Sequence, residues 1–371
     1  MKTSLVKHFS NIPDPRMINK CDHKLIDILV ITVCATICRC DESWVSIEDF
    51  AEIRLDWLKK FLELPNGIPS HDTIRRLFLL LDPVEFQNCF YEWASSFREK
   101  ITGETIAFDG KTSRGSRDNQ LGKKAIHMVS AWANENKLVL GQIKVDEKSN
   151  EITAIPKLLD LLDISGCTVT IDAMGTQKNI VAKIVDNNAD YVLGLKENQK
   201  NLHDDVKTYI DDQLDVELTD NSHQKKMTTD ADHGRIEERA FHLFTNLHWL
   251  EQVPDWKGLI GIGVVESKIE KNGKTSFERR YYITSLNCIE KFAKNVRGHW
   301  GIENSLHWIL DVAFNEDDST RRKGNSPANS AVLRHITLNL LKNEKTKKRS
   351  INGKRCLASL DTGYLEKVIF G

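Results

Sequence analysis

The sequence has no apolar run long enough to span a membrane. Its longest candidate, residues 25–38, contains Asp27 and is only 14 residues long, whereas a spanning helix needs about 20 predominantly apolar residues. We interpret this run as a buried helix and expect no contact with a membrane. The N-terminal residues also lack the apolar segment and the small-residue cleavage site of a signal peptide. We therefore expect a cytoplasmic protein.

Paired cysteines are missing as well. The eight cysteines are scattered along 371 residues without a CxxC pair, so neither a disulfide framework nor a zinc ribbon is indicated. Cys34, Cys38 and Cys40 are close enough in the sequence to bind a metal, but buried thiols are the commoner explanation for such cysteines. Repeats and low-complexity tracts are absent too, so we take domain boundaries from changes in periodicity.

Acidic residues are scarce near the C-terminus. Between Ser319 and Arg355 there are eleven Lys or Arg and one acid, Glu344, whereas residues 203–220 hold seven acids and one Lys. The net charge of −1 conceals this imbalance. A basic segment of this kind is typical of a contact with a polyanion, or simply of a solvated surface. We predict a basic C-terminal tail over residues 346–371.

Helical periodicity dominates residues 1–100. Four amphipathic stretches each begin near a Ser or Asp that can cap a helix. We predict a small all-α N-terminal domain that contacts DNA ends. A Pro/Gly turn before a short helix with Arg75 and Arg76 resembles the second helix of a helix-turn-helix, although two ordinary surface arginines fit equally well.

The periodicity changes to that of an α/β domain at Glu104. Strands are predicted at 104–109, 124–134, 137–146, 167–172 and 190–196, and helices at 153–163 and 177–188. The first three strands fit an antiparallel meander, and helices connect the later ones. From 201 to 290 helical periodicity fails and a KNGK turn indicates a hairpin. We therefore predict a catalytic domain over residues 101–345 that contains a β-rich insertion at 201–290.

Two aspartates end predicted strands of this domain. Asp109 and Asp172 are each followed by a loop that contains glycine. Carboxylates at the ends of strands in an α/β sheet can converge at the edge where ligands bind. An aspartate also begins turns and caps helices, so a third acid is needed to support a site. Two hard divalent cations require several carboxylate oxygens.

The third acid is found in residues 297–312, RGHWGIENSLHWILDV. At about 100° per residue, the apolar face of this helix consists of Ile302, Leu306, Ile309, Leu310 and Val312. The opposite face mixes tryptophan and histidine with charged residues, which is not typical of a solvated face. It consists of Arg297, His299, Trp300, Glu303, Asn304, His307, Trp308 and Asp311.

His299, Glu303 and His307 form one stripe of this helix and could be taken for a zinc site. At about 1.5 Å per residue, however, they span roughly 12 Å, too far for a single ion. We therefore interpret Glu303 as the one carboxylate that the helix contributes, with histidine and tryptophan around it.

Five segments, in this order, resemble bacterial insertion-sequence DDE transposases. They are AFDGK (107–111), TIDAMGTQ (170–177), DYVLGLKENQ (190–199), DHGRIEER (232–239) and VRGHWGIENSLHWILDVAFNEDDSTRR (296–322). The resemblance covers nearly the whole chain and points to the branch that includes the H-repeat-associated proteins of Rhs elements. It implies an α/β fold with a ribonuclease-H-like catalytic core and a β-rich insertion, preceded by a small all-α N-terminal domain.

By position in these segments, the resemblance implies that Asp109, Asp172 and Glu303 are the catalytic and metal-binding residues. The strand and helix patterns select the same three. The implied cofactors are two Mg²⁺ ions, for which Mn²⁺ can substitute, with Asp109 bridging both ions and the other two acids holding one each. A Tyr, Arg and Lys signature that often surrounds the glutamate is absent, because Val296, His299 and Leu310 stand at its positions.

Basic, polar and aromatic residues near these acids are predicted to contact DNA. Trp300 would stack on an unpaired or distorted base, and the others would contact phosphates. The predicted set is Lys111, Arg114, Lys196, Gln199, Arg297, His299, Trp300, His307, Arg321 and Arg322. Asp311 lies two turns beyond Glu303 and could be mistaken for the third ligand, but we expect it to pair with an arginine such as Arg321 or Arg322.

Together, these features predict a transposase that catalyses metal-dependent cleavage and strand transfer of insertion-sequence DNA. Its partners would be double-stranded DNA, as terminal inverted repeats and as target, and a second copy of the chain, because two ends must be paired. When bound to DNA it would be associated with the nucleoid. Two alternatives stay open: a transposase-derived DNA-binding protein or repressor without mobility, and a stand-alone nuclease with the same core.

Overall fold

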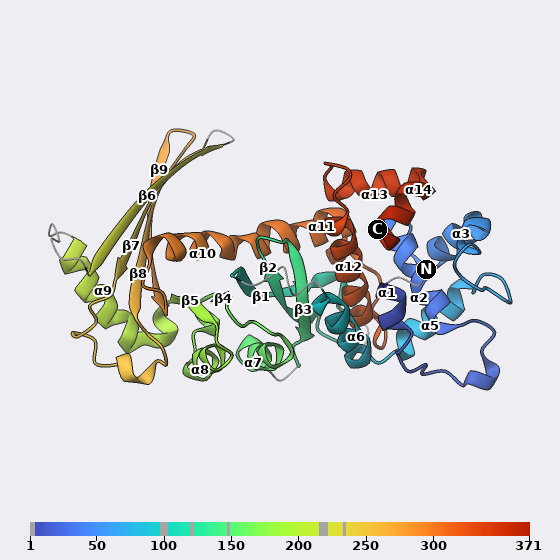
Figure 1. The fold of residues 1–371 in the computed structure, drawn as a ribbon, viewed down its shortest axis with the longest axis horizontal. Helices are drawn as coiled ribbons and strands as arrows, with labels where there is room; N and C mark the ends of the chain where they lie inside the picture. The colour runs from blue at the N-terminus through green and yellow to red at the C-terminus, as the bar shows by residue number, and fades with distance from the viewer. Residues whose placement is uncertain (1–3, 97–102, 119–121, 147–148, 215–221, 233–234) are drawn as a thin grey trace.

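The computed structural model describes residues 4–96, 103–118, 122–146, 149–214, 222–232 and 235–371. The molecule is elongated, and three parts follow one another along its long axis (Figure 1). Helices from both ends of the chain form one part, a mixed sheet with its helices forms the middle, and long antiparallel strands form the far end. Across the described ranges, no helix is both long and apolar enough to cross a membrane.

One nine-stranded sheet runs through the middle part and the insertion. Its strands are β1 (Thr105–Ser113), β2 (Ile126–Ala133), β3 (Leu138–Lys144), β4 (Thr168–Ile171), β5 (Asp190–Leu195), β6 (His223–Asp232), β7 (Arg235–Phe244), β8 (Gly261–Lys271) and β9 (Lys274–Thr284), in the order β3-β2-β1-β4-β5-β9-β8-β7-β6. β1, β2 and β3 are antiparallel, whereas β1, β4 and β5 are parallel. Helices α7 (Glu151–Leu161) and α8 (Lys178–Asp186) make the connections. This topology confirms the predicted ribonuclease-H-like α/β core.

The insertion begins with a helix, which the sequence pattern did not predict. Helix α9 (Lys200–Leu214) covers much of the acid-rich stretch, and it buries Leu202, Val206 and Ile210 at a spacing of four. The predicted hairpin is confirmed, because β8 and β9 are joined through Asn272 and Gly273, both with positive φ. β9 also pairs with β5, so the insertion extends the core sheet instead of forming a sheet of its own.

Helices from both ends of the chain pack around one central helix. α12 (Ser326–Asn343) is buried along nearly its whole length and lies between helices that precede and follow the sheet (Figure 1). The N-terminal ones are α1 (Ser4–Phe9), α2 (Leu25–Ile37), α3 (Trp44–Ile53), α4 (Leu55–Leu58), α5 (His71–Leu80) and α6 (Pro83–Ser95), and the C-terminal ones are α13 (Ile351–Leu360) and α14 (Thr362–Phe370). The buried α2 confirms our interpretation of the apolar run.

Residues 346–371 are therefore not a solvated tail, and that prediction was wrong. Lys354 and Arg355 are buried. The Arg355 guanidinium donates to the carbonyl oxygen of Thr36 (2.7 Å) and lies 3.1 Å from the Asp41 carboxylate. The basic residues counted in the sequence thus include structural cations that fasten the C-terminal helices to the N-terminal ones.

Glu344, at the end of α12, holds both C-terminal helices. Its carboxylate accepts a hydrogen bond from the Tyr364 hydroxyl (2.6 Å) and lies 3.4 Å from the Lys354 ammonium. Burial alone would raise the pKa of Glu344, but hydrogen bonds from Thr346 and Tyr364, with the charge of Lys354, lower it to about 2. The carboxylate therefore stabilises the packing of α13 and α14 only in its ionised form.

Replacing Glu344 with alanine is expected to lower the free energy of unfolding by about 2 kcal/mol, since it leaves Lys354 buried without its charged partner. Because the folded pKa lies below the unfolded value, this stabilisation is complete above about pH 4.3 and is lost as the pH falls towards 2. Urea unfolding at pH 3 and pH 7 tests this. Glu344→Gln should lose less stability than Glu344→Ala. Its free energy of unfolding should also fall less between pH 7 and pH 3 than that of the wild type; an equal fall would contradict the assignment.

Candidate active site

The parallel pairing of β1 and β4 brings the two predicted aspartates together. The register pairs Phe108 with Ile171 and ends there, so Asp109 and Asp172 follow side by side. We predicted that the first strand ends at Asp109. β1 instead continues to Ser113 in its pairing with β2. Asp172 caps the short helical turn after β4 and accepts a hydrogen bond from the Gly175 backbone (3.4 Å).

The loop that carries Asp172 is braced from the end of β5. The Asn198 amide donates to the carbonyl oxygen of Ala173 (2.6 Å), and the Gln199 amide donates to that of Thr176 (2.9 Å). Gln199, which we predicted to contact phosphate, therefore uses its amide to fix the loop. The ends of two neighbouring strands are thus tied together around Asp172.

The third predicted acid lies where a helix changes its pitch. α10 (Ile289–Ile302) is followed by a π-helical turn, Glu303–His307, and by α11 (Trp308–Phe314). In the π turn, the Trp308 backbone amide donates to the carbonyl oxygen of Glu303, five residues back. Such turns are rare and occur frequently at functional sites. Glu303 begins the turn and is exposed.

The π turn also explains one error in the predicted apolar face. Ile302, Leu306, Ile309 and Leu310 are buried as expected, but Val312 is 47% exposed. A regular helix would have kept Val312 near the core. Because the π turn adds a residue, the positions that follow are rotated, and Ala313 and Phe314 are buried instead.

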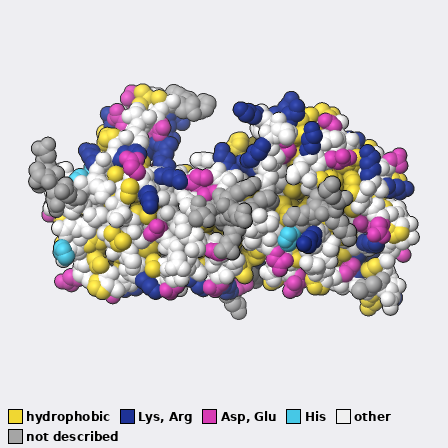
Figure 2. Space-filling model, in the orientation of Figure 1, with side chains coloured by type: hydrophobic (Ala, Val, Ile, Leu, Met, Phe, Trp, Pro, Cys, Tyr) yellow, Lys and Arg dark blue, Asp and Glu magenta, His cyan; other side chains and the backbone are white. Residues whose placement is uncertain are grey.

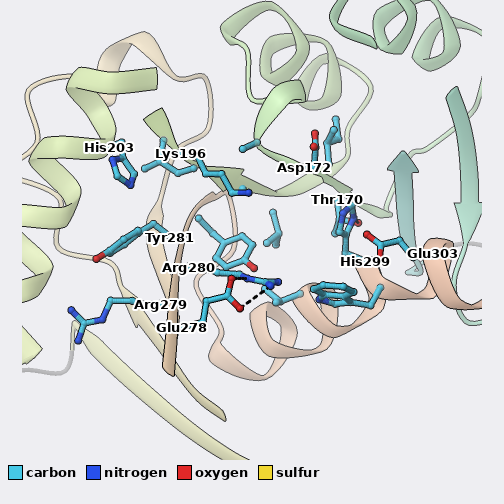
Figure 3. Close-up of a pocket in the computed structure, with 18 residues that line it drawn as sticks. Thr170, Asp172, Lys196, His203, Glu278, Arg279, Arg280, Tyr281, His299 and Glu303 are labelled. Carbon is cyan, nitrogen blue, oxygen red and sulfur yellow. Dashed lines mark hydrogen bonds and ion pairs between the residues drawn. The ribbon is translucent and has the colours of Figure 1, made fainter. Parts of the chain in front are cut away.

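Asp172 and Glu303 face the same cavity, of about 350 Å³. Figure 3 shows them projecting from the end of β4 and from the helix, with Thr170 and His299 between them. Lys196 and Arg280 also line this cavity, from β5's end and from β9. Glu278 and Arg279 line it as well, so three acids and three cations converge on one space.

The acids of this site repel one another, although the Lys196 ammonium partly offsets the effect at Asp172. Burial, together with the charges of Glu151, Asp172 and Glu303, raises the pKa of Asp109 to about 7. Burial, followed by the charge of Glu151, also raises the pKa of Asp172. The acids are therefore close enough to disfavour one another's ionisation, which is the situation that a bound divalent cation relieves.

The carboxylates of this site are suitable ligands for hard divalent ions that are each held by two side chains. Among the residues that the structure describes, no three His, Cys, Asp or Glu side chains are placed to hold one ion together. Mg²⁺ usually takes one or two carboxylates and completes its shell with water and substrate phosphates. Asp109, Asp172 and Glu303 supply the oxygen ligands that such a site needs.

Two histidines of the predicted DNA-contacting set hold the helix against the sheet. His307 Nδ1 lies 3.5 Å from the Asp109 carboxylate, and His299 Nδ1 lies 3.1 Å from the Thr170 hydroxyl. Burial is the main cause that lowers the pKa of each to about 4. Both imidazoles are neutral at pH 7, so they position the helix and do not offer positive charge to phosphate.

Lys111, which we predicted to contact phosphate, is enclosed by acids. Its ammonium lies 2.7 Å from Asp311, 3.4 Å from Glu316 and 3.5 Å from Asp317. The predicted pairing of Asp311 with an arginine is therefore wrong, because Lys111 is its partner. This contact ties β1, two residues after Asp109, to α11 and the turn that follows it.

Arg321 is also structural instead of DNA-facing. It is buried, donates to the Asp41 carbonyl oxygen (2.9 Å) and lies 4.1 Å from the centre of the Trp44 ring. The neighbouring Arg322 is exposed and donates to the Gly115 carbonyl oxygen (3.2 Å). Arg114 keeps most of its side chain in solvent. Arg322 and Arg114 are thus both accessible to solvent.

A second cavity, of about 510 Å³, lies between α10 and the insertion strands. Arginines line it, and each has an acidic partner. They are Arg235, Arg239, Arg280 and Arg297, which pair with Glu237, Glu237, Glu278 and Asp230 respectively. Only Arg297 of these was predicted. The alternation of charged and apolar residues along β7 and β9 is the signal that could have identified the others.

Trp300 stands between the two cavities. It lines both, is 40% exposed, and its ring lies 4.9 Å below the Arg280 guanidinium. The cavities share Arg280, Tyr282 and Trp300, so they form one groove along α10. Figure 2 shows a notch between the insertion and the helical end, with Lys and Arg side chains on both walls. We name the two cavities together the α10 groove.

A ribonuclease-H-like sheet with two aspartates at its strand edge, and a glutamate on a helix beyond a β-rich insertion, defines the DDE class of proteins. The family model described as "Transposase DDE domain" matches residues 100–340, and the model described as "DDE_Tnp_1-associated" matches residues 6–94. The chain belongs to the DDE transposase family.

Curated relatives agree with this assignment. The chain is 45% identical over 373 residues to "Putative transposase YncI" of Escherichia coli O157:H7, covering 99% of this chain and 94% of that protein. It is 42% identical over 380 residues to "H repeat-associated putative transposase YhhI" of E. coli K12, covering 99% and 98%. Among solved structures, a piggyBac transposase synaptic complex with hairpin DNA aligns with 11% identity and a TM-score of 0.45, over 100% of this chain and 78% of that one.

Proposed function

We propose that this protein is an active transposase that cleaves the ends of an insertion-sequence element and joins them to target DNA. The observation that supports it most is the convergence of Asp109, Asp172 and Glu303, from two adjacent strands and a distant helix, into one cluster of repelling acids. A protein that only binds DNA gains nothing from a cluster of acids that oppose one another's ionisation.

Asp109, Asp172 and Glu303 would hold divalent ions, and His307 would orient Asp109. When bound, such ions polarise the scissile phosphate and stabilise the attacking and leaving oxygens of an in-line displacement. The Lys196 ammonium lines the same cavity, where it can neutralise a non-bridging phosphate oxygen. The 3′-hydroxyl produced by cleavage would remain beside the acids for the joining step.

The α10 groove is the surface that we assign to DNA near the cleavage point. Its arginines already pair with acids, so phosphates would have to compete for them and bind at partly neutralised positions. Trp300 offers an aromatic face beside Glu303, and stacking on an unpaired base is sequence-tolerant. Double-stranded DNA and a second copy of the chain are the partners that this reaction requires.

Cleavage of DNA that carries the element's own terminal repeats tests the proposal. With Mg²⁺ or Mn²⁺, the protein should cut at the repeat boundary and join the product to a target duplex, and it should not do so in EDTA. A scrambled duplex of the same length is the control. Equal cutting of both duplexes would point to a stand-alone nuclease, and tight end binding without any cutting would point to a repressor; either outcome would overturn the proposal.

Trp300→Ala is expected to weaken binding to end DNA with an unpaired base at the cleavage point by about tenfold, since base stacking on an aromatic ring contributes about 1–3 kcal/mol. Trp308→Ala is the matched control, because Trp308 is 60% exposed on the same helical run but lines neither cavity. Fluorescence anisotropy in Ca²⁺, which blocks turnover, measures both. A larger loss for Trp308→Ala would show that the DNA follows a different path.

A further inference from the structure

Gly110, next to Asp109, is overlain by two side chains from other elements. A Cβ atom on Gly110 would lie 2.0 Å from Glu151 Oε1 and 2.5 Å from His127 Nε2. Real Cβ atoms essentially never come that close, so any side chain at position 110 would displace the Glu151 carboxylate and the His127 ring from where they lie. The Glu151 carboxylate thus packs directly against the Gly110 backbone, next to Asp109.

Glu151 is fixed in this place by His127. Glu151 is the first residue of α7, and its Oε1 lies 2.7 Å from His127 Nε2. The other ring nitrogen, His127 Nδ1, lies 2.8 Å from the Thr112 hydroxyl. Thr112 and His127 face each other in the pairing of β1 with β2. The sheet therefore holds the histidine, and the histidine holds the glutamate over Gly110.

The packing of α7 also brings Glu151 near the loop that carries Asp172. α7 contacts β2 and the turn Ala173–Gly175, which Asp172 caps, and Ile155 of α7 lies 3.2 Å from where a Cβ atom on Gly175 would be. A glutamate in the first turn of a helix is usually explained by the helix dipole alone. That explanation does not account for its position over Gly110, where His127 holds its carboxylate.

We propose that Glu151 is a fourth carboxylate of the divalent-ion site, and that His127 is the residue that positions it. This inference rests on the proposed function, because it adds a ligand to the site formed by Asp109, Asp172 and Glu303. A fourth oxygen donor on the β2 side of Asp109 would complete the ligand set from the direction opposite to the helix that carries Glu303. His127 contributes by orienting the glutamate and does not touch the ions.

Titration of the metal-free protein with Mn²⁺ alone, by calorimetry and by electron paramagnetic resonance, tests the inference without any DNA. Glu151→Gln is expected to weaken Mn²⁺ binding by about tenfold or more, within the range for residues that support a metal site. It should also raise the melting temperature of the metal-free protein by about 1–2 °C, since it removes repulsion among the acids. Glu85→Gln is the matched control, because Glu85 lies in the first turn of α6 and is exposed.

Further variants separate charge from position. Glu151→Asp keeps the charge but shortens the side chain, so it should lose Mn²⁺ affinity without gaining stability. His127→Ala should weaken Mn²⁺ binding, and His127→Gln, which retains a hydrogen-bonding group, should recover part of it. Circular dichroism confirms that each variant is folded.

Asp109→Asn makes the two proposals distinguishable. If Asp109→Asn loses Mn²⁺ affinity and Glu151→Gln does not, Glu151 is no ligand, although the proposed function stands. If neither loses affinity, the metal site itself fails, and this inference fails with it. Loss in both, with the Glu85→Gln variant unchanged, supports the assignment.

Discussion

Asp109→Ala, Asp172→Ala and Glu303→Ala are each expected to reduce DNA cleavage on the order of 10³-fold, which corresponds to about 4 kcal/mol of transition-state stabilisation. Each substitution removes an oxygen ligand from a site whose chemistry depends on ions beside the scissile phosphate. Binding of end DNA should change little, because removing a negative charge near phosphate does not weaken the complex. Single-turnover cleavage with Mg²⁺, alongside anisotropy measurements, separates the two effects.

Asp318→Ala is the control for this set. Asp318 lies in the same acidic run beyond Glu303 and is exposed, so its removal should leave cleavage within about twofold of the wild type, as for most surface changes. Normal cleavage by Glu303→Ala, together with loss in Asp311→Ala, would transfer the third ligand from Glu303 to Asp311. Full activity in all three variants would contradict the proposed function.

Lys111→Ala is expected to lower the free energy of unfolding by about 3 kcal/mol, because it removes a mostly buried cation and takes a cationic partner from the buried Glu316. Burial alone would lower the pKa of Lys111, but Glu316, Asp311 and Asp317 together raise it, so the side chain stays charged. Cleavage should also fall by about tenfold in the folded variant, since a small shift of α11 moves Glu303 away from Asp109.

Urea unfolding and single-turnover cleavage measure these two losses. A double-mutant cycle with Asp311→Ala should show a coupling energy of about 1 kcal/mol or more, as for residues in direct contact. Lys111→Arg keeps the charge and should retain most of the stability. If Lys111→Ala were as stable as the wild type but bound DNA more weakly, Lys111 would be a phosphate contact after all.

The three acids that we propose as catalytic could be selected from the sequence because each is marked by a local pattern. Asp109 and Asp172 stand beside apolar strand residues, and Glu303 lies on the polar face of an amphipathic helix. The parallel register then brings the two aspartates together. Periodicity within about ten residues was therefore enough to predict the succession of core strands along the chain and to select the candidate acids.

The errors arise where a partner is distant in the sequence. Lys111 lies 200 residues from Asp311, and Arg321 lies 280 residues from Asp41. Nothing near either cation distinguishes a buried ion pair from a surface charge that awaits phosphate. Glu151 and His127 escaped prediction for the same reason, since a glutamate that begins a helix is common and its place over Gly110 depends on β1 and β2.

The acid-rich helix α9 shows a different limit. Its buried residues, Leu202, Val206 and Ile210, repeat every four positions, but the many acids around them obscured that stripe. Val312 illustrates a third limit, because a regular helical wheel has no place for a π turn.

The continuity of β5 with β9 gives the insertion a mechanical role. Since the insertion shares the core sheet and α10 packs against β1, β6 and β7, the described residues connect the groove directly to the three candidate acids. α10 acts as a stiff rod of about 21 Å, with Arg297 and Trp300 near the end that carries Glu303. A force exerted by bound DNA on the insertion would therefore be transmitted through α10 to Glu303. DNA binding at the insertion and cleavage would then be mechanically coupled.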